Sequence, residues 1–288
     1  MHRRQFLAAA ATAALVPAGN ARAAGMVPFS LDLRPPLDSK GAFVDWMAAN
    51  RLEDRDFLGQ RWDRYKAMEA RHDLWDGKDV RAYLLTPRED FVTARNLSRA
   101  YVWHYLDIGF GVTITGPHTV GRMTSVIDVK PGESVLEVGT GSGYQSAYLS
   151  HLTDRIHTIE IIKPLFERTR GVYDGLIAKG YSEFANIRMR NADGYYGWPE
   201  AAPFDKIIVT CGIDHVPPDL LRQLKPNGTM VIPVGPPGAQ HVLKIAATTA
   251  ADGAVRIARS DIYNGAIIPF VPFTRLAGGK IVGTHNGN

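Results

Sequence analysis

The chain has 288 residues, enough for one or two domains with a sizeable hydrophobic core. Its 33 Lys and Arg residues and 29 Asp and Glu residues give a net charge of +4. Three of the arginines and none of the acids fall within the first 23 residues, so the remainder is almost neutral and gives no charge argument for nucleic-acid binding. The single cysteine, Cys211, excludes an intrachain disulfide.

Residues 1–24 have the pattern of a secretory signal. Arg3 and Arg4 precede an Ala- and Leu-rich run, and Ala-Arg-Ala at 21–23 forms a small-x-small cleavage site. The Arg-Arg-x-Phe-Leu spelling is typical of twin-arginine signals, which export folded proteins. The apolar run contains Pro17 and Gly19 and is too short to span a bilayer, so we expect no stable membrane anchor after its removal. This pattern predicts a periplasmic or exported protein, with a cytoplasmic location as the alternative.

Residues 25–78 are expected to form a linker followed by a helical extension. The stretch 25–39 is rich in proline and lacks periodicity, which indicates extended chain. From about 41 to 75, apolar side chains such as Phe57, Trp62 and Tyr65 recur at helical spacing. An aromatic stripe of this kind usually packs on a core, so we assign it no function.

Residues 79–288 are expected to form an α/β domain. The first helix should stop before Pro87, and 109–123 should form a glycine-rich loop that leads into a helix. Strands then alternate with helices, one of which Gly180 should cap. The stretch 242–263 has the pattern of a hairpin with an Asp-Gly turn. The alternation predicts a doubly wound, mostly parallel sheet with an antiparallel C-terminal element.

The most informative stretch is 134–152, where a short apolar strand is followed by a glycine loop and the start of a helix. Gly139, Gly141 and Gly143 leave backbone N–H groups accessible to a ligand because they carry no Cβ. The spelling is E-x-G-x-G-x-G, and not the G-x-G-x-x-G of dinucleotide sites. A carboxylate at Glu137 suits a ligand with a cationic amino group, and Glu160 ends the next strand, where it can hold a ribose. These features favour S-adenosylmethionine as the ligand.

Several motifs together resemble the protein-L-isoaspartate (D-aspartate) O-methyltransferases. The resemblance extends from about Asp79 to Leu276 and keeps the family's order and approximate spacing. The segments that carry it are TPREDFV, AYVW, GFGVTITGPH, KPGESVLEVGTGSGYQSAYLS, IHTIEIIKPLFERTR, NADGYYGWPEAAPFDKIIVTC, VPPDLLRQLKPNGTMVIPVG and FVPF.

The resemblance implies a Rossmann-like class I methyltransferase fold and transfer of a methyl group from S-adenosylmethionine to the free carboxylate of L-isoaspartyl residues. The substrates would be damaged proteins or peptides, and we expect a monomer. The implied cofactor-binding residues are Glu137, Gly139, Thr140, Gly141, Gly143, Glu160, Asp193 and Gly194. The loop 113–118 would close over the acceptor, with Thr115, Thr113 and His118 as its implied catalytic residues.

The acceptor carboxylate is already an anionic nucleophile, so the chemistry needs alignment and removal of water more than a general base. A Thr113 or Thr115 hydroxyl can position the carboxylate without protonating it. The loop of the family usually reads Q-T-I-S-x-P, whereas this chain has V-T-I-T-G-P. Val112 therefore stands in place of the glutamine, and Thr115 stands in place of the serine. These departures leave open a different carboxylate, peptide or small-molecule acceptor. A non-catalytic protein that binds S-adenosylmethionine is the alternative from another class.

The remaining polar residues give weaker signals. His151, His157 and His215 have no metal-ligand spacing with one another or with Cys211, so we predict no metal site. Cys211 ends an apolar strand and is expected to be a buried small hydrophobe. The neighbouring Asp214 and His215 are weak site candidates, and Asp205 has either a structural or a site role.

Overall fold

The computed structural model describes residues 25–250, 255–277 and 280–283. Within these residues, seven strands form one sheet in the order β5-β4-β3-β6-β7-β8-β9. The pairs from β5 to β7 are parallel, and β8 and β9 add antiparallel strands at one edge. The predicted α/β class, with a mostly parallel sheet and an antiparallel C-terminal element, is therefore confirmed. The strands are β3 (Ser134–Val138), β4 (Arg155–Glu160), β5 (Ile187–Asn191), β6 (Phe204–Val209), β7 (Leu224–Val234), β8 (His241–Thr249) and β9 (Val255–Asp261).

The central strands are buried on both faces, which explains their nearly continuous apolar sequence. In β3, Val135 points into one hydrophobic cluster, whereas Leu136 and Val138 point into the other. The first cluster also contains side chains of the N-terminal helices and of the helices between β3 and β5. The second contains Leu220 of the short helix before β7. The main helices are α3 (Gly77–Leu85), α4 (Pro117–Ile127), α5 (Tyr144–Ser150), α6 (Lys163–Lys179) and α7 (Pro218–Gln223).

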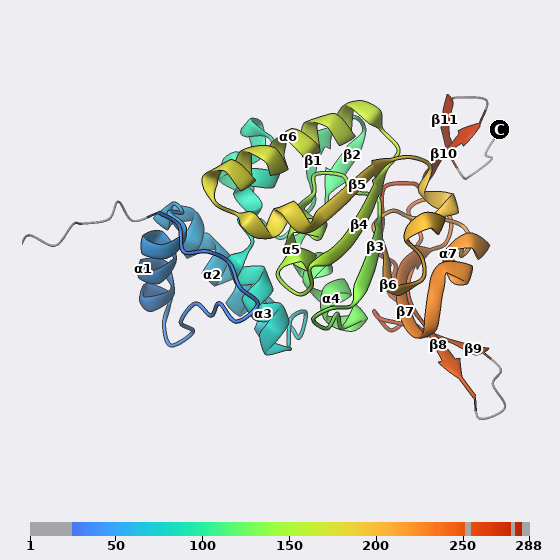
Figure 1. Cartoon of the computed structure of the whole chain (residues 1–288), viewed down its shortest axis with the longest axis horizontal. Coiled ribbons are helices and arrows are strands. Elements are labelled where there is room, and N and C mark those ends of the chain that lie inside the picture. The colour runs from blue at the N-terminus through green and yellow to red at the C-terminus, as the bar shows by residue number, and fades with distance from the viewer. Residues whose placement is uncertain (1–24, 251–254, 278–279, 284–288) are drawn as a thin grey trace, which may run out of the picture.

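The helical pattern of the extension corresponds to two helices in the structure. Helix α1 (Lys40–Arg51) ends at Leu52, whose φ of 57° lies in the left-handed region. Helix α2 (Arg55–Ala70) begins after Asp54, whose side chain accepts hydrogen bonds from the N–H groups of Asp56 and Phe57. Both helices lie at one end of the molecule, and the β8–β9 hairpin lies at the other (Figure 1).

The predicted loop at 109–123 is also only partly correct, since it contains a small hairpin. Strands β1 (Leu106–Gly109) and β2 (Val112–Ile114) pair in antiparallel fashion. Arg168 of α6 donates a hydrogen bond to the carbonyl of Ile108 and thereby fixes the hairpin beside the sheet. The predicted helix, α4, begins at Pro117, which lies inside the stretch predicted as a loop.

The C-terminal part leaves the sheet after β9. Strands β10 (Thr274–Ala277) and β11 (Lys280–Gly283) form a second small hairpin, which projects from the body of the molecule in Figure 1. Short 3₁₀ helices occupy several connections: η1 (Arg88–Phe91), η2 (Ala94–Arg99), η3 (Ser182–Asn186), η4 (Gly194–Tyr196) and η5 (Pro199–Ala201). Gly180 caps α6 with a φ of 115°, as expected.

Two predictions from the sequence concern residues that the structure does not describe. The export signal at 1–24 lies outside the described residues, and so does the Asp-Gly turn between β8 and β9. In the part of the chain that is described, no helix is both long enough and apolar enough to span a bilayer.

Candidate active site

The glycine loop connects β3 to α5 at the carboxyl end of the sheet, where the strand order reverses between β3 and β6. Gly139 and Gly143 have φ values of 99° and 90°, which residues with a Cβ rarely adopt. A Cβ on Gly139 would lie 2.5 Å from Thr210 Oγ1, and one on Gly143 would lie 2.6 Å from the Tyr173 hydroxyl. The loop is therefore closely packed from behind, and its other side borders a cavity of about 300 Å³.

Glu160 ends β4 and fixes the glycine loop through hydrogen bonds. Its Oε2 accepts a hydrogen bond of 2.8 Å from the Gly141 N–H, and its Oε1 accepts one of 2.9 Å from the Ile162 N–H. Burial raises the pKa of Glu160, although both hydrogen bonds act to lower it. The residue also lines the cavity. Each carboxylate oxygen has a second lone pair, so Glu160 can accept hydrogen bonds from ribose hydroxyls while it holds the loop.

Glu137 lies in β3 and is fully buried, and its two carboxyl oxygens differ in their hydrogen bonding. Its Oε2 accepts hydrogen bonds from Ser146 Oγ and from Thr158 Oγ1, the latter at 2.6 Å. Among the described residues, its Oε1 has no hydrogen-bond partner. Burial raises the pKa of Glu137 to about 8, against an ordinary value of 4.5. Glu137 borders a small cavity of about 50 Å³, together with Thr140 and other residues of the glycine loop.

An unsatisfied buried oxygen beside a glycine loop fits the cationic amino group of S-adenosylmethionine, which can donate to Glu137 Oε1. Thr140 supports this arrangement, since its hydroxyl lies 2.6 Å from Thr158 Oγ1, which also bonds to Glu137. The residues present therefore fit the cofactor that the sequence predicts.

Asp193 and Gly194 are adjacent in sequence but differ in their placement. Gly194 lines the main cavity, and a Cβ there would lie 2.5 Å from Val138 Cγ1. Asp193 does not line the cavity. Its carboxylate accepts hydrogen bonds from the N–H groups of Tyr195, at 2.9 Å, and Leu276, at 3.0 Å. The structure thus gives Asp193 a role in holding the C-terminal segment against η4.

The acceptor loop, which we define as residues 112–118, forms part of the wall of the same cavity. Its lining residues include the predicted Thr113, Thr115 and His118, together with Val112 and Gly116. One continuous space therefore joins the glycine loop and Glu160 to Thr113 and Thr115.

His118 lies in a setting that favours packing over acid–base chemistry. Its ring stacks on that of Trp103, with centroids 4.5 Å apart and an angle of 5° between the planes. Burial lowers its pKa, so the neutral imidazole is favoured at neutral pH. Gly116 has no room for a side chain, because a Cβ would lie 2.5 Å from the Trp103 carbonyl oxygen. The loop therefore packs closely on the segment around residue 103.

The sequence did not identify the C-terminal strap, residues 268–274, as part of the site. All seven of its residues line the cavity. Gln240 holds its beginning, because the Gln240 carbonyl accepts from the Ile268 N–H and its Oε1 accepts from the Phe270 N–H. Gly212 holds its end through two backbone hydrogen bonds, with Val271 and Phe273. The FVPF segment was the only signal for the strap, and it carries no periodicity.

Other residues that the sequence singled out are placed as follows. Cys211 is not a fully buried hydrophobe as expected, since it is half-buried and lines the cavity. Asp205 has the structural role, because its Oδ2 accepts from the Ser134 N–H and from Lys225 Nζ. Asp214 and His215 bond to each other in an exposed position and do not line the main cavity. Among the described residues, no group of three His, Cys, Asp or Glu side chains has the geometry of a metal site.

A match to a known protein family covers most of the residues of the chain. The sequence model of the family described as protein-L-isoaspartate (D-aspartate) O-methyltransferase (PCMT) matches residues 69–275. The chain belongs to this family. Its match includes the glycine loop, the acceptor loop and the strap, but it begins near the end of α2, so most of the extension precedes it.

Individual relatives carry the family's name. The protein-L-isoaspartate O-methyltransferase 2 of Polaromonas sp. is 51% identical over 149 residues, which cover 52% of this chain and 68% of that protein. The protein-L-isoaspartate O-methyltransferase 1 of Nitrosospira multiformis is 51% identical over 150 residues, which cover 61% of its length. The protein-L-isoaspartate O-methyltransferase of Opitutus terrae is 40% identical over 203 residues, covering 70% of this chain and 82% of that one.

A solved structure supports the fold. The Plasmodium falciparum protein-L-isoaspartate O-methyltransferase, in complex with S-adenosyl-L-homocysteine, aligns with a TM-score of 0.60 at 21% identity. The alignment covers 73% of this chain and 96% of that one. It confirms the predicted Rossmann-like methyltransferase fold.

Proposed function

We propose that the protein transfers a methyl group from S-adenosylmethionine to the free carboxylate of L-isoaspartyl residues in damaged proteins or peptides. The observation that carries this proposal is the single cavity that joins the glycine loop and Glu160 to Thr113 and Thr115. The family to which the chain belongs is one of S-adenosylmethionine-dependent enzymes named for this reaction, and the relatives described above carry the same name.

The protein's own residues bind, orient and exclude water. Glu137 would bind the amino group of the cofactor and Glu160 its ribose hydroxyls. When bound, the cofactor would supply a methyl group on a positively charged sulfur. Thr113 and Thr115 line the acceptor end of the cavity, where their hydroxyls can donate hydrogen bonds to the substrate carboxylate. The carboxylate needs no deprotonation, in agreement with a neutral, stacked His118.

Water exclusion follows from the walls of the cavity. The strap closes one side and the acceptor loop another, so a carboxylate between them loses much of its hydration. An anion stripped of water and held in line with the methyl group is a stronger nucleophile. The site therefore acts by positioning and desolvation.

The test uses the chain from Ala24, labelled S-adenosylmethionine and two peptides that differ only in one residue, L-isoaspartate or normal aspartate. We expect incorporation of base-labile methyl groups into the isoaspartyl peptide alone. If S-adenosylmethionine binds in a calorimeter but neither peptide is methylated, the acceptor assignment is wrong. Val112 and Thr115 face the cavity, so a different carboxylate in a peptide or small molecule is the second candidate acceptor.

We also propose that residues 1–24 direct export through the twin-arginine route and that the mature protein acts as a periplasmic monomer. The support is the sequence pattern, with Arg3 and Arg4 before the apolar run. Fusion of residues 1–30 to a reporter should give twin-arginine-dependent export, and replacement of both arginines by lysine should abolish it. A reporter that stays in the cytoplasm would contradict the proposed location.

A further inference from the structure

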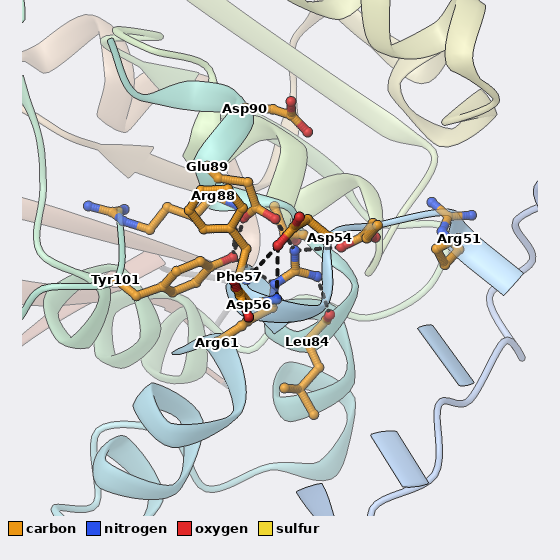
Figure 2. A network of polar contacts seen from close by, with 12 residues as sticks. Arg51, Asp54, Asp56, Phe57, Arg61, Leu84, Arg88, Glu89, Asp90 and Tyr101 are labelled. Atoms are coloured by element: carbon orange, nitrogen blue, oxygen red, sulfur yellow. Dashed lines mark hydrogen bonds and ion pairs between the residues drawn. The ribbon is translucent and has the colours of Figure 1, made fainter. Parts of the chain in front are cut away.

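Helix α2 of the N-terminal extension buries a charged side chain, Arg61, whose exposed fraction is zero. Its Nε donates a hydrogen bond of 2.7 Å to the Tyr101 hydroxyl, and its Nη1 donates one of 2.8 Å to the Leu84 carbonyl. Its Nη2 donates to Glu89 Oε1 at 2.9 Å and forms an ion pair of 2.5 Å with Glu53. Figure 2 shows the Arg61 guanidinium between Leu84, Glu89 and Tyr101.

This cluster joins two parts of the chain. Glu53 and Arg61 belong to the extension, whereas Leu84, Glu89 and Tyr101 belong to the segment that follows it. A guanidinium presents its N–H donors in a fixed planar fork, so partners in several directions hold one another in a single arrangement. A buried polar network of this kind tolerates little displacement, because any donor left without a partner is costly.

The network continues from Tyr101 toward the acceptor loop. The Tyr101 hydroxyl donates to Glu89 Oε2 at 2.5 Å and accepts from the Arg88 N–H at 3.2 Å. The Arg88 guanidinium is also fully buried, and its Nε donates to the Ala100 carbonyl at 2.7 Å. Its Nη2 donates to the carbonyl of Thr115 at 2.7 Å. Thr115 is therefore held through its backbone by a chain of contacts that starts in the extension.

A second contact of α2 reaches the C-terminal end of the same loop, at His118. Arg64 donates from Nε to the Tyr101 carbonyl at 2.7 Å, and its guanidinium lies 4.7 Å from the ring centroid of Trp103. The same Trp103 ring stacks on His118. Two positions of the acceptor loop, Thr115 and His118, are thus linked through neighbouring residues to α2.

We propose that Arg61 is a positioning residue for the acceptor loop, so that the N-terminal extension sets the place of the Thr115 hydroxyl in the active site. This inference rests on the proposed role of that loop in holding the substrate carboxylate. It assigns the extension a part in acceptor use and not in cofactor binding, since Glu160 fixes the glycine loop by separate hydrogen bonds.

Two variants of the full mature chain test the inference. Tyr101→Phe removes one oxygen and thereby the contacts that join Arg61, Glu89 and the Arg88 backbone. Arg61→Lys keeps the cation but cannot reach Tyr101 and Leu84 together. The matched control is Arg51→Met, which removes another fully buried cation of the extension. Arg51 pairs with Glu183 at 2.5 Å, in η3 and away from the acceptor loop.

The measurements are kcat and KM for the isoaspartyl peptide, the Kd for S-adenosylmethionine, and hydrogen exchange of the amides at 112–119. In Tyr101→Phe and Arg61→Lys we expect kcat/KM for the peptide to fall at least tenfold relative to the wild-type protein. The Kd for S-adenosylmethionine should stay within threefold of the wild-type value, and the loop amides should exchange faster. Arg51→Met should lower the melting temperature while peptide kinetics stay within twofold. If one of the two variants does not fold, the other carries the test.

Two results would overturn the inference. In the first, Tyr101→Phe and Arg61→Lys fold but leave peptide kinetics and loop exchange unchanged. In the second, Arg51→Met changes peptide kinetics and loop exchange as much as they do. Failure of the proposed function would look different, because the wild-type chain would then not methylate the isoaspartyl peptide. In that case the comparison of loop exchange among the variants still decides whether the extension positions the loop.

Discussion

The carboxylate of Glu160 accepts a hydrogen bond of 2.8 Å from the backbone N–H of Gly141, so the residue that ends β4 fixes the loop that follows β3. This contact joins two neighbouring parallel strands at their carboxyl ends, where residues of both line the cavity. Glu160 therefore has two tasks, since it shapes the loop and presents free lone pairs to a ligand.

We predict that Glu160→Gln weakens cofactor binding 10- to 100-fold. The amide keeps one acceptor oxygen but directs an NH₂ group toward a backbone N–H, and a hydrogen bond to a charged group contributes about 1.5–3 kcal/mol. Calorimetric titration with S-adenosylmethionine measures the change. Glu200→Gln serves as the control, because Glu200 is exposed and pairs only with Arg190 among the contacts described for it. An unchanged Kd in Glu160→Gln would contradict the assignment.

The glycine loop gives a second prediction. Gly139→Ala should lower the melting temperature and abolish measurable cofactor binding, because the new Cβ meets Thr210 Oγ1 at 2.5 Å with φ at 99°. Gly171→Ala in α6 is the matched control, since nothing lies within 4 Å of its Cβ position. An alanine within a helix should stabilise the protein by about 0.5–1 kcal/mol. Thermal denaturation compares the two, and equal effects would contradict the packing described for the loop.

The local part of this site could be predicted from the sequence, because a strand, three glycines and a helix start lie within one short stretch. The strap could not, since its backbone is irregular and its position depends on distant contacts with Gln240 and Gly212. The β1–β2 hairpin escaped prediction because its strands have only four and three residues and β1 ends in a glycine. The division of the extension at Leu52 had one usable signal, the helix-capping Asp54, whose side chain bonds to two amides of α2.

Glu137 provides a prediction about pH. Burial raises its pKa to about 8 from 4.5, so the folded protein without cofactor holds a proton that the unfolded chain has lost at neutral pH. The stability from this group is therefore complete below pH 4.5 and is lost as the pH rises through about 8. A cationic amino group beside Oε1 favours the ionised form, so binding should release a proton.

Titration with S-adenosylhomocysteine at pH 7, in buffers of different ionisation enthalpy, measures that proton. We expect release by the wild-type protein and none by Glu137→Gln. The decrease in melting temperature between pH 6 and pH 8.5 should also be smaller in the variant. Equal proton release by both proteins would show that another group titrates.

The last prediction concerns Thr115 in the acceptor loop, the position at which the family usually has a serine. Thr115→Val removes the hydroxyl with little change in shape, whereas Thr115→Ser keeps the hydroxyl and removes a methyl group. If the hydroxyl holds the substrate carboxylate, Thr115→Val should lower kcat/KM for an isoaspartyl peptide 10- to 100-fold, the loss of one hydrogen bond to a charged group of about 1.5–3 kcal/mol. The Kd for S-adenosylmethionine should stay within twofold, because the glycine loop and both glutamates are untouched.

Thr115→Ser should retain activity and, with a less restricted χ1, accept a wider range of peptides. Should the valine variant methylate the peptide at the wild-type rate, positioning of the carboxylate would fall to Thr113, whose hydroxyl shares the cavity.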